Sequence, residues 1–361
     1  MATARVSRSP AVITAPAYNS QLTKFGIKAL VTLFAIMLLL VYLLPLGNMI
    51  MVALSTQDQL SQTADDSVIP QQPITFEYQG EAYDVYRVPT ESGIRELALV
   101  DPGRRASDFV DPANPDAGLI NWEGNWRTLE PVSRVSLAWD NFGIAWESIN
   151  FPRLFTNTLI IAVAGMIGTL LSCIAVAYAF ARFPIPGKNL LFIILIGTII
   201  LPTQVTLIPT YAFFAAIGWT NSWLPLIVPH FFANAYNVFL LRQYFMTLPR
   251  ELDEAAMIDG AGPLRTLLSV IIPQSWPAII SVGVFHFVWA WNDYFGPLIY
   301  LIGRPDLQPV SVGVQVFNFQ YGPRQELVQA TSMMALILPV IIFFLAQRVF
   351  MRGIVVTGVE K

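Results

Sequence analysis

Long stretches without charged residues alternate with polar segments along this chain, and these stretches set its predicted architecture. A helix needs about 20 apolar residues to cross the hydrocarbon core of a bilayer. The stretches that fit one crossing each are residues 29–57, 154–181 and 327–347. The longer stretch 189–241 fits two crossings, with Gly-Trp-Thr-Asn-Ser at 218–222 as the turn between them. A further crossing over 276–302, interrupted only by Asp293, brings the predicted membrane helices to six.

The composition agrees with a protein embedded in a bilayer. Apolar residues make up 55% of the chain and charged residues only 12%, with a mean hydropathy of +0.55. A soluble domain carries about 25% charged residues. We therefore expect an all-α polytopic membrane core. Prolines within the crossings predict kinked helices that pack against protein, and they are Pro202, Pro209, Pro225, Pro229 and Pro339.

Residues 248–277 form a polar, Ala-rich segment between two of the apolar stretches. Pro249 suits the first turn of a helix, and Gly260 suits its C-terminal end. Acidic side chains in the first turn complement the positive end of the helix macrodipole, and they are Glu251, Asp253 and Glu254. We expect a helix of about ten residues there, followed by a second short helix from Pro263 to near Pro273. An amphipathic helix lying on the membrane surface is the alternative interpretation.

Residues 54–152 differ in composition and lie between the first and second predicted crossings. They hold nine Asp and seven Glu against six Arg and no Lys, which accounts for the acidic pI of about 5.5. Residues 75–100 alternate aromatic or β-branched with polar side chains, and turn sequences at 79–80 and 89–93 predict a small β-meander. Residues 137–149 carry three aromatic side chains at helical spacing, Trp139, Phe142 and Trp146. We therefore expect a small mixed α/β insertion.

The basic residues indicate the orientation of the chain, because Lys and Arg concentrate on the cytoplasmic side of membrane proteins. Basic residues occur in four segments: before the first crossing, after the second, in residues 248–277, and after the sixth. In a six-crossing arrangement all four segments lie on the same side of the membrane. Both termini are then cytoplasmic, and the insertion is extracytoplasmic. A cleaved secretory signal is the alternative for the first apolar run, but that run is too long and lacks a clear small-residue cleavage site. The expected organisation is a cytoplasmic segment 1–28, a helix 29–53, the insertion 54–152, a core 153–352 with the loop 248–277, and a cytoplasmic tail 353–361.

Several kinds of chemistry are excluded by residues that the sequence lacks. Cys173 is the single cysteine, and the two histidines, His230 and His286, lie in apolar segments, so we expect no metal site and no disulfide. No Gly-x-x-x-x-Gly-Lys-Ser/Thr sequence is present, so the chain has no phosphate-binding loop for ATP. The acidic insertion argues against nucleic acid as a partner and, more weakly, against anionic cargo.

The polar segment 248–277 resembles the signature of permease subunits of binding-protein-dependent ABC importers. That signature is Glu-Ala-Ala, three residues, Gly, nine residues and an ending similar to Ile-x-Leu-Pro. Here it reads Glu-Ala-Ala at 254–256, Gly260, and Val-Ile-Ile-Pro at 270–273, with other aliphatic residues in the two apolar places. Further motifs resemble the carbohydrate-uptake branch: Asn-Thr-Leu at 157–159, Ala-Tyr-Ala-Phe-Ala-Arg-Phe at 177–183, Trp-Asn-Asp at 291–293, and Gln347-Arg348 through Arg352-Gly353. The resemblance covers residues 151–361 well and the first 150 only in part, where the insertion is similar to the enlarged loop of α-glucoside-type permeases.

The resemblance implies a permease subunit of an ATP-driven importer for a sugar, such as an oligosaccharide or α-glucoside, in the cell membrane of a prokaryote. It implies four kinds of partner: a homologous second permease, a pair of ATPase subunits that bind ATP and Mg, an extracytoplasmic solute-binding protein, and membrane lipid. The cleft of the ATPase would grip the 248–277 loop, whose docking residues are then Glu254, Ala255, Ala256, Asp259 and Gly260. Small side chains would allow close backbone approach there, and acidic ones would supply docking charges. The tail from Arg352 to Lys361 is a further candidate contact with the ATPase.

A sugar pathway needs aromatic faces for C–H surfaces and amide or carboxylate groups for hydroxyls. The candidates within the crossings are Gln204, Asn234, Tyr236, Trp289, Trp291, Asn292 and Asp293. The alternative is structural, because Trp and Tyr also collect at membrane interfaces and Asn joins helices by hydrogen bonds.

Two other functions stay open from the sequence. His286 and Asp293 lie seven residues apart, two turns along one helical face, and would form the proton relay of a proton-coupled sugar symporter. Alternatively, both are structural. The carboxylates of the insertion would suit a membrane-anchored glycosidase, since such enzymes use a pair of them. For a permease, the insertion is either a contact surface for the solute-binding protein or a passive cap over the mouth of the pathway.

Overall fold

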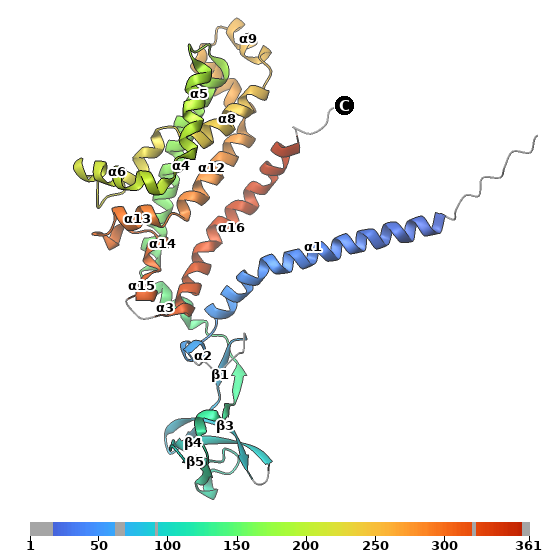
Figure 1. Ribbon diagram of the computed structural model, residues 1–361, viewed down its shortest axis with the longest axis vertical. Helices are drawn as coiled ribbons and strands as arrows, with labels where there is room; N and C mark the ends of the chain where they lie inside the picture. The colour runs from blue at the N-terminus through green and yellow to red at the C-terminus, as the bar shows by residue number, and fades with distance from the viewer. Residues whose placement is uncertain (1–16, 62–68, 91–92, 320–322, 356–361) are drawn as a thin grey trace, which may run out of the picture. The chain divides into compact units, whose positions relative to one another are not determined.

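The computed structural model describes residues 17–61, 69–90, 93–319 and 323–355 (Figure 1). The chain divides into two compact units, Met1–Met51 and Val52–Lys361. The first consists, in its described part, of most of helix α1 (Ala17–Ala53). The apolar side chains of α1 are exposed from Leu30 through Leu44, which suits a helix that faces lipid or other membrane helices.

The second unit begins with a β-rich segment. After the short helix α2 (Gln57–Ser61), the strands are β1 (Gln71–Pro73), β2 (Thr75–Tyr78), β3 (Glu81–Thr90), β4 (Gly93–Asp101), β5 (Ala106–Val110), β6 (Ile120–Glu123), β7 (Glu130–Pro131) and β8 (Ser133–Val135). Strands β2 to β6 pair in sequence order, all antiparallel. The short strand β7 pairs with Tyr86 and Arg87 of β3, beyond the part that pairs with β2, and β1 and β8 form a separate pair. The alternating residues 75–100 therefore form the predicted meander.

The turn between β2 and β3 shows why the meander folds where it does. Gln79 and Gly80 have φ angles of 54° and 86°, the two positive values that a tight type I′ hairpin turn needs. Side chains alternate between the two faces of β3 and β4, so each face of the sheet contributes to a separate hydrophobic cluster. Val85 and Ala98 pack in one cluster, and Val88 and Leu97 pack in another.

The remaining helices follow the insertion. They are α3 (Asp140–Ser148), α4 (Phe151–Arg182), α5 (Lys188–Gly197), η3 (Thr198–Ile200), α6 (Thr203–Ala216), α7 (Leu224–Ile227), η4 (Val228–Phe231), α8 (Ala235–Thr247), α9 (Glu251–Ile258), α10 (Pro263–Thr266), η5 (Leu267–Ile271), α11 (Ile272–Gln274), α12 (Trp276–Trp291), α13 (Phe295–Tyr300), η6 (Pro305–Leu307), α14 (Val310–Gly313), α15 (Val316–Phe319) and α16 (Gln325–Val355). Three aromatic residues were predicted at helical spacing. Phe142 and Trp146 lie in α3, and Trp139 directly precedes its first residue.

Helix α4 is the central element of the helical part. It packs along both α8 and α12, as Figure 1 shows. The core between these helices is formed by small and apolar side chains, which are Cys173, Ala177, Leu241, Phe245, Ile271 and Val282. The other long helix, α16, packs against α12 and α3. Small side chains on α4 allow this close approach of helices, as is common in membranes.

Among the described residues, four helical stretches are long and apolar enough to cross a membrane, and up to six if each bent helix pair counts as one crossing. The four are Lys24–Ala53, Phe151–Arg182, Leu224–Thr247 and Gln325–Arg348. The bent pairs are Lys188–Ile200 with Val205–Ala216, at 99°, and Pro263–Gln274 with Trp276–Trp291, at 82°. The prediction of one continuous crossing over 276–302 is wrong, because α12 ends at Trp291 and α13 begins only at Phe295.

Candidate functional site

The Glu-Ala-Ala motif lies on α9, the first arm of a helical hairpin that we call the signature hairpin, residues 248–277. Its helix ends in a left-handed residue, Gly260, with φ 76°. The N–H of Ala261 donates to the carbonyl of Ala256 at 2.9 Å, and the N–H of Gly260 donates to that of Met257 at 3.0 Å. This pair of bonds is a Schellman motif, which satisfies carbonyls that the helix end would otherwise leave free. The predicted stop at Gly260 is thus confirmed.

The second arm begins at Pro263, as predicted, and continues to Gln274. Its middle turn, Leu267–Ile271, is a π-helix. A π-turn inserts an extra residue in the helix. Such turns occur mostly singly within α-helices and are frequent at functional sites. After Ser275 the chain bends by 82° into α12, so the signature hairpin connects directly to a long apolar helix.

The signature hairpin turns most of its motif outward. Glu254, Ala255, Asp259 and Gly260 are exposed. Ala256 is an exception, because its side chain is only 8% exposed and faces the interior of the chain. Our expectation that both alanines offer room to a partner therefore needs correction: Ala255 is exposed and Ala256 supports the packing of α9.

Large apolar side chains lie beside these motif residues, and they were not predicted. Met257 is 64% exposed, Ile258 86% and Leu264 69%. The signature hairpin thus presents apolar and acidic groups side by side. Such a mixed patch suits a protein partner better than water alone, because exposed apolar side chains that gather in one place mark interaction sites.

A second candidate site is a cavity of about 630 Å³ between the helices. It is lined by Ile199, His230, Asn234, Tyr236, Asn237, Phe285, His286 and Trp289. Three of the seven predicted pathway residues meet here, namely Asn234, Tyr236 and Trp289. Asn234 also begins helix α8, where its Oδ1 accepts a hydrogen bond from the N–H of Asn237 at 2.9 Å.

The other predicted pathway residues do not line this cavity. Trp291 is buried against Phe155 and Phe287. Asn292 donates a hydrogen bond to the carbonyl of Val288 in the preceding turn, and an oxygen of Asp293 accepts the N–H of Gly296 at 3.2 Å. These three side chains serve local structure. The side chain of Gln204 lies outside the described part of the chain.

Two histidines line the cavity that sequence reasoning did not assign to the pathway. The His230 and His286 rings meet edge to face at 4.6 Å between centroids, and Trp289 contacts both. Nδ1 of His286 lies 3.1 Å from Oγ1 of Thr169 on α4, and its Nε2 has no hydrogen-bond partner among the described residues. A polar residue in an apolar span was the signal available in the sequence.

The proposed relay between His286 and Asp293 does not fit this geometry. His286 lies within α12, but the helix ends at Trp291, so Asp293 is not two turns further along the same helical face. Asp293 instead caps the start of α13 through Gly296. The relay was predicted from the seven-residue spacing of these two residues in one helix. Because the helix ends between them, that spacing does not place them on one face.

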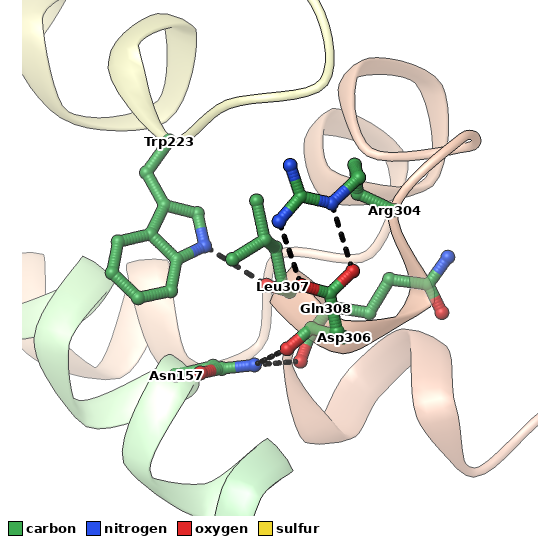
Figure 2. A network of polar contacts seen from close by, with 6 residues as sticks. All are labelled: Asn157, Trp223, Arg304, Asp306, Leu307 and Gln308. Carbon is green, nitrogen blue, oxygen red and sulfur yellow. Dashed lines mark hydrogen bonds and ion pairs between the residues drawn. The ribbon is translucent and has the colours of Figure 1, made fainter.

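The N-terminal part of α4, at Asn157, is joined to a loop by polar contacts that Figure 2 shows. Nδ2 of Asn157 donates to the carbonyls of Asp306 and Gln308, both at 2.9 Å, and Nε1 of Trp223 donates to that of Leu307 at 2.9 Å. Arg304 donates two further hydrogen bonds to the Asp306 carboxylate, and they hold the pKa of that carboxyl below its usual value. We call these residues the loop network. They fix residues 304–308 to the start of α4.

Comparison with known proteins identifies related chains. The model of the family described as "Binding-protein-dependent transport system inner membrane component" matches residues 168–355. The osmoprotective compounds uptake permease protein GgtD of Synechocystis sp. is 34% identical over 282 residues, which cover 76% of this chain and 93% of that protein. The alpha-glucoside transport system permease protein AglG of Rhizobium meliloti is 29% identical over 287 residues, covering 76% and 74%. The sn-glycerol-3-phosphate transport system permease protein UgpE of Shigella flexneri is 34% identical over 229 residues, covering 63% and 79%.

A solved structure shares the fold. It is that of a bacterial ABC transporter involved in the import of the acidic polysaccharide alginate, with a TM-score of 0.62 over 93% of this chain and 99% of that chain, at 18% identity. Together with its apolar helices and the exposed Glu-Ala-Ala hairpin, these matches identify the chain. It belongs to the family of binding-protein-dependent transport system inner membrane components, which are multi-pass permease subunits and not enzymes.

Proposed function

We propose that this chain is the permease subunit of an ATP-driven importer for a sugar, such as an oligosaccharide or an α-glucoside. The observation that carries the proposal is the exposed signature hairpin, whose motif ends in a capped, rigid turn at Gly260 in a chain of this family. The chain has no phosphate-binding loop sequence. ATP and Mg then belong to separate ATPase subunits.

The complete importer contains a second, homologous permease, two ATPase subunits and an extracytoplasmic solute-binding protein. In this arrangement the chain crosses the membrane six times, and both termini and the signature hairpin lie in the cytoplasm. The excess of Lys and Arg in the corresponding segments supports that orientation. Residues 54–152 then lie outside, where they act as a contact surface for the solute-binding protein.

The signature hairpin is the part that an ATPase subunit grips. Its exposed carboxylates, Glu254 and Asp259, offer charges, and Met257 and Ile258 offer apolar area to the same cleft. A partner shifts a conformational equilibrium only if it contacts the two states differently. Closure of the two ATPase subunits would therefore move the signature hairpin and, through it, the helices from inward-facing to outward-facing.

The cavity around Trp289 is the proposed solute pathway. Its polar lining consists of two amides, two imidazoles and a phenol, and its described lining includes no Lys or Arg. Such groups exchange hydrogen bonds with hydroxyls, while the faces of Trp289 and Tyr236 cover C–H surfaces. Relatives named for sn-glycerol-3-phosphate and alginate handle anions, but this lining favours an uncharged sugar.

The test is uptake by the reconstituted complex. We would purify the chain with the proteins that copurify with it, place the complex in vesicles, and measure entry of labelled oligosaccharides and α-glucosides. Uptake should require ATP on the hairpin side together with the ATPase subunits, and a protonophore should not affect it. Uptake that continues without ATPase subunits and stops with a protonophore would favour a symporter instead.

A smaller experiment tests the insertion. A variant that replaces residues 71–135 with a short linker should assemble with the ATPase but lose stimulation of ATP hydrolysis by the solute-binding protein. Full stimulation in that variant would leave the insertion the role of a passive cap.

A further inference from the structure

A buried ion pair joins the signature hairpin to the end of α4. Nε of Arg182 lies 3.1 Å from Oδ2 of Asp253, and the two side chains are only 8% and 12% exposed. The Nη2 group of Arg182 also donates to the carbonyl of Leu248 at 3.0 Å. Arg182 is the last residue of α4, and Asp253 lies in the first turn of α9.

A second contact holds the other arm of the signature hairpin to the same helix. The hydroxyl of Tyr178, one turn before Arg182, donates to the carbonyl of Pro263 at 3.4 Å. Residues four apart lie on one face of a helix. One face of α4 therefore holds both arms, the first by a charge pair and the second by a weaker hydrogen bond.

The ion pair is poorly suited to a purely stabilising role. Within the described residues, neither Nε of Arg182 nor Oδ2 of Asp253 has a partner with hydrogen-bond geometry, although they lie in ion-pair range. Removing two charges from water costs several kcal/mol for each, and their attraction offsets that cost only when the geometry is excellent. A pair of well-packed apolar side chains would stabilise this site at least as well. The best-attested use of such a pair is to fix the register of two elements.

There is also room for the pair to change. A cavity of about 310 Å³ lies beside it, lined by both charged side chains together with Tyr178, Glu254, Met257 and Thr266 among others. The first turn of α9 can thus shift against α4 without displacing a close-packed core. Close-packed interiors, by contrast, transmit or resist strain as a unit.

Helix α4 connects this pair to the solute cavity. Thr169, whose hydroxyl contacts His286, lies on α4 thirteen residues before Arg182, a distance of about 20 Å at 1.5 Å per residue. Gly165 on the same helix lies so close to the histidines that an added Cβ would be 2.9 Å from Nε2 of His286. A shift of α4 along or about its axis would therefore act on His286 and His230, which line the cavity.

We propose that the Arg182–Asp253 pair links the docking helix to the solute cavity: it converts movement of α9 into movement of α4, and Thr169 and Gly165 pass that movement to the His230–His286 pair. The inference rests on the proposed function and names the residues that couple its two sites. Arg182 and Asp253 are positioning residues, because neither side chain lines the cavity around Trp289.

The test compares ATP hydrolysis with uptake in the reconstituted complex. Arg182→Gln and Asp253→Asn should still assemble and hydrolyse ATP, but uptake per ATP should fall about tenfold, within the usual range of coupling between sites. The exchange Arg182→Asp with Asp253→Arg should restore most of the uptake. Glu251→Gln is the matched control, since it removes the same charge from the first turn of α9 and leaves the buried pair intact.

A second variant separates coupling from folding. Arg182→Met with Asp253→Leu fills the site with apolar side chains and should be as stable as the natural protein, yet it should show the same loss of uptake per ATP. Normal uptake in this variant, or a parallel loss of assembly, hydrolysis and uptake in the single variants, would overturn the inference. If the natural complex itself imports no sugar, the proposed function fails. If the natural complex does import sugar, either of these two results for the variants overturns the inference alone.

Discussion

Gly260 shows how a single residue fixes the shape of the signature hairpin. Its φ of 76° lies in the left-handed region, where an L side chain costs about 1–2 kcal/mol. No atom lies within 4 Å of the position that a Cβ would take. The chain therefore leaves open space at this position, and a side chain added there would project from the surface of the signature hairpin.

We predict that Gly260→Trp leaves the protein in the membrane at normal level but abolishes coupling. The indole would occupy the space that the ATPase cleft needs, so uptake should fall at least about tenfold, or 1.4 kcal/mol in transition-state terms. Gly260→Asn is the control, because Asn tolerates the left-handed conformation and adds less bulk. Vesicle uptake and ATP hydrolysis, measured side by side, check it. Normal uptake by the Trp variant would contradict the docking role.

A second prediction concerns the solute. Trp289 lines the cavity, contacts both histidines and is 58% exposed, so its face is available to a sugar. Trp289→Ala should raise the KM for uptake about tenfold, equal to about 1.4 kcal/mol of binding, while Trp289→Phe keeps an aromatic face and should change it less. Trp291→Phe is the comparison from the core, since Trp291 does not line the cavity. An unchanged KM in Trp289→Ala would remove Trp289 from the pathway.

The sequence alone could identify only part of these residues. The spacing from Glu254 to Gly260 is a local property, because a helix stop depends on the next few residues. The grouping of His230 with Asn234 and Trp289 is not local, since it depends on how η4, α8 and α12 meet. The burial of Ala256 had the same cause: helical spacing gives faces, but only the packing of α9 decides which face is inside.

At the scale of elements, α4 is the structural axis of this permease. One end of α4 holds the loop network, its middle contacts the cavity residue His286 through Thr169, and its other end holds the signature hairpin. A helix of 32 residues spans about 48 Å at 1.5 Å per residue, enough to join all three. The long stretch without charged residues predicted this helix. Its hydrogen-bond partners at each end could not be predicted in the same way, because they lie more than 60 residues away along the chain.

We predict that Asn157→Leu loosens the loop network. The carbonyls of Asp306 and Gln308 would both lose their donor in a partly buried site, and each lost hydrogen bond costs about 0.5–1.5 kcal/mol. Hydrogen exchange of residues 303–309 should become faster and thermal stability of the detergent-solubilised protein should fall. Arg304→Gln removes an exposed ion pair, which contributes about 0–1 kcal/mol, and should have a much smaller effect. Equal effects of the two changes would contradict the role of Asn157.

At the scale of the whole molecule, the distribution of charge predicts the membrane side of each part, and the insertion folds around a core of its own. The basic segments at both termini and in the signature hairpin predict that these parts lie on one side of the membrane, and the acidic insertion on the other. The antiparallel meander of the insertion closes its own core from β3, β4 and β5. It therefore needs no membrane helix to complete its packing.

We predict opposite accessibility for two introduced cysteines. In a Cys173→Ala background, which removes the single natural cysteine, Asp116→Cys in the insertion should react with a membrane-impermeant maleimide on intact cells. Asp259→Cys on the signature hairpin should react only after the cells are opened. Both positions are exposed in the structure, so in cells that lack the ATPase subunits a lack of reaction reports the membrane side and not coverage by a docked partner. Reaction of Asp259→Cys on intact cells would reverse the orientation and exclude ATPase docking from the cytoplasm.

The sequence by itself determined the membrane class, the position of most apolar helices, the β-meander and the signature hairpin with its stop at Gly260. Each of these depends on composition, periodicity or a turn that neighbouring residues specify. Tertiary structure alone decided that α12 ends at Trp291, that Arg182 pairs with Asp253 inside the protein, and that two histidines share a cavity with Trp289. The physical reason is that burial and pairing are properties of contacts between distant segments, and periodicity along one segment says nothing about which segment it meets.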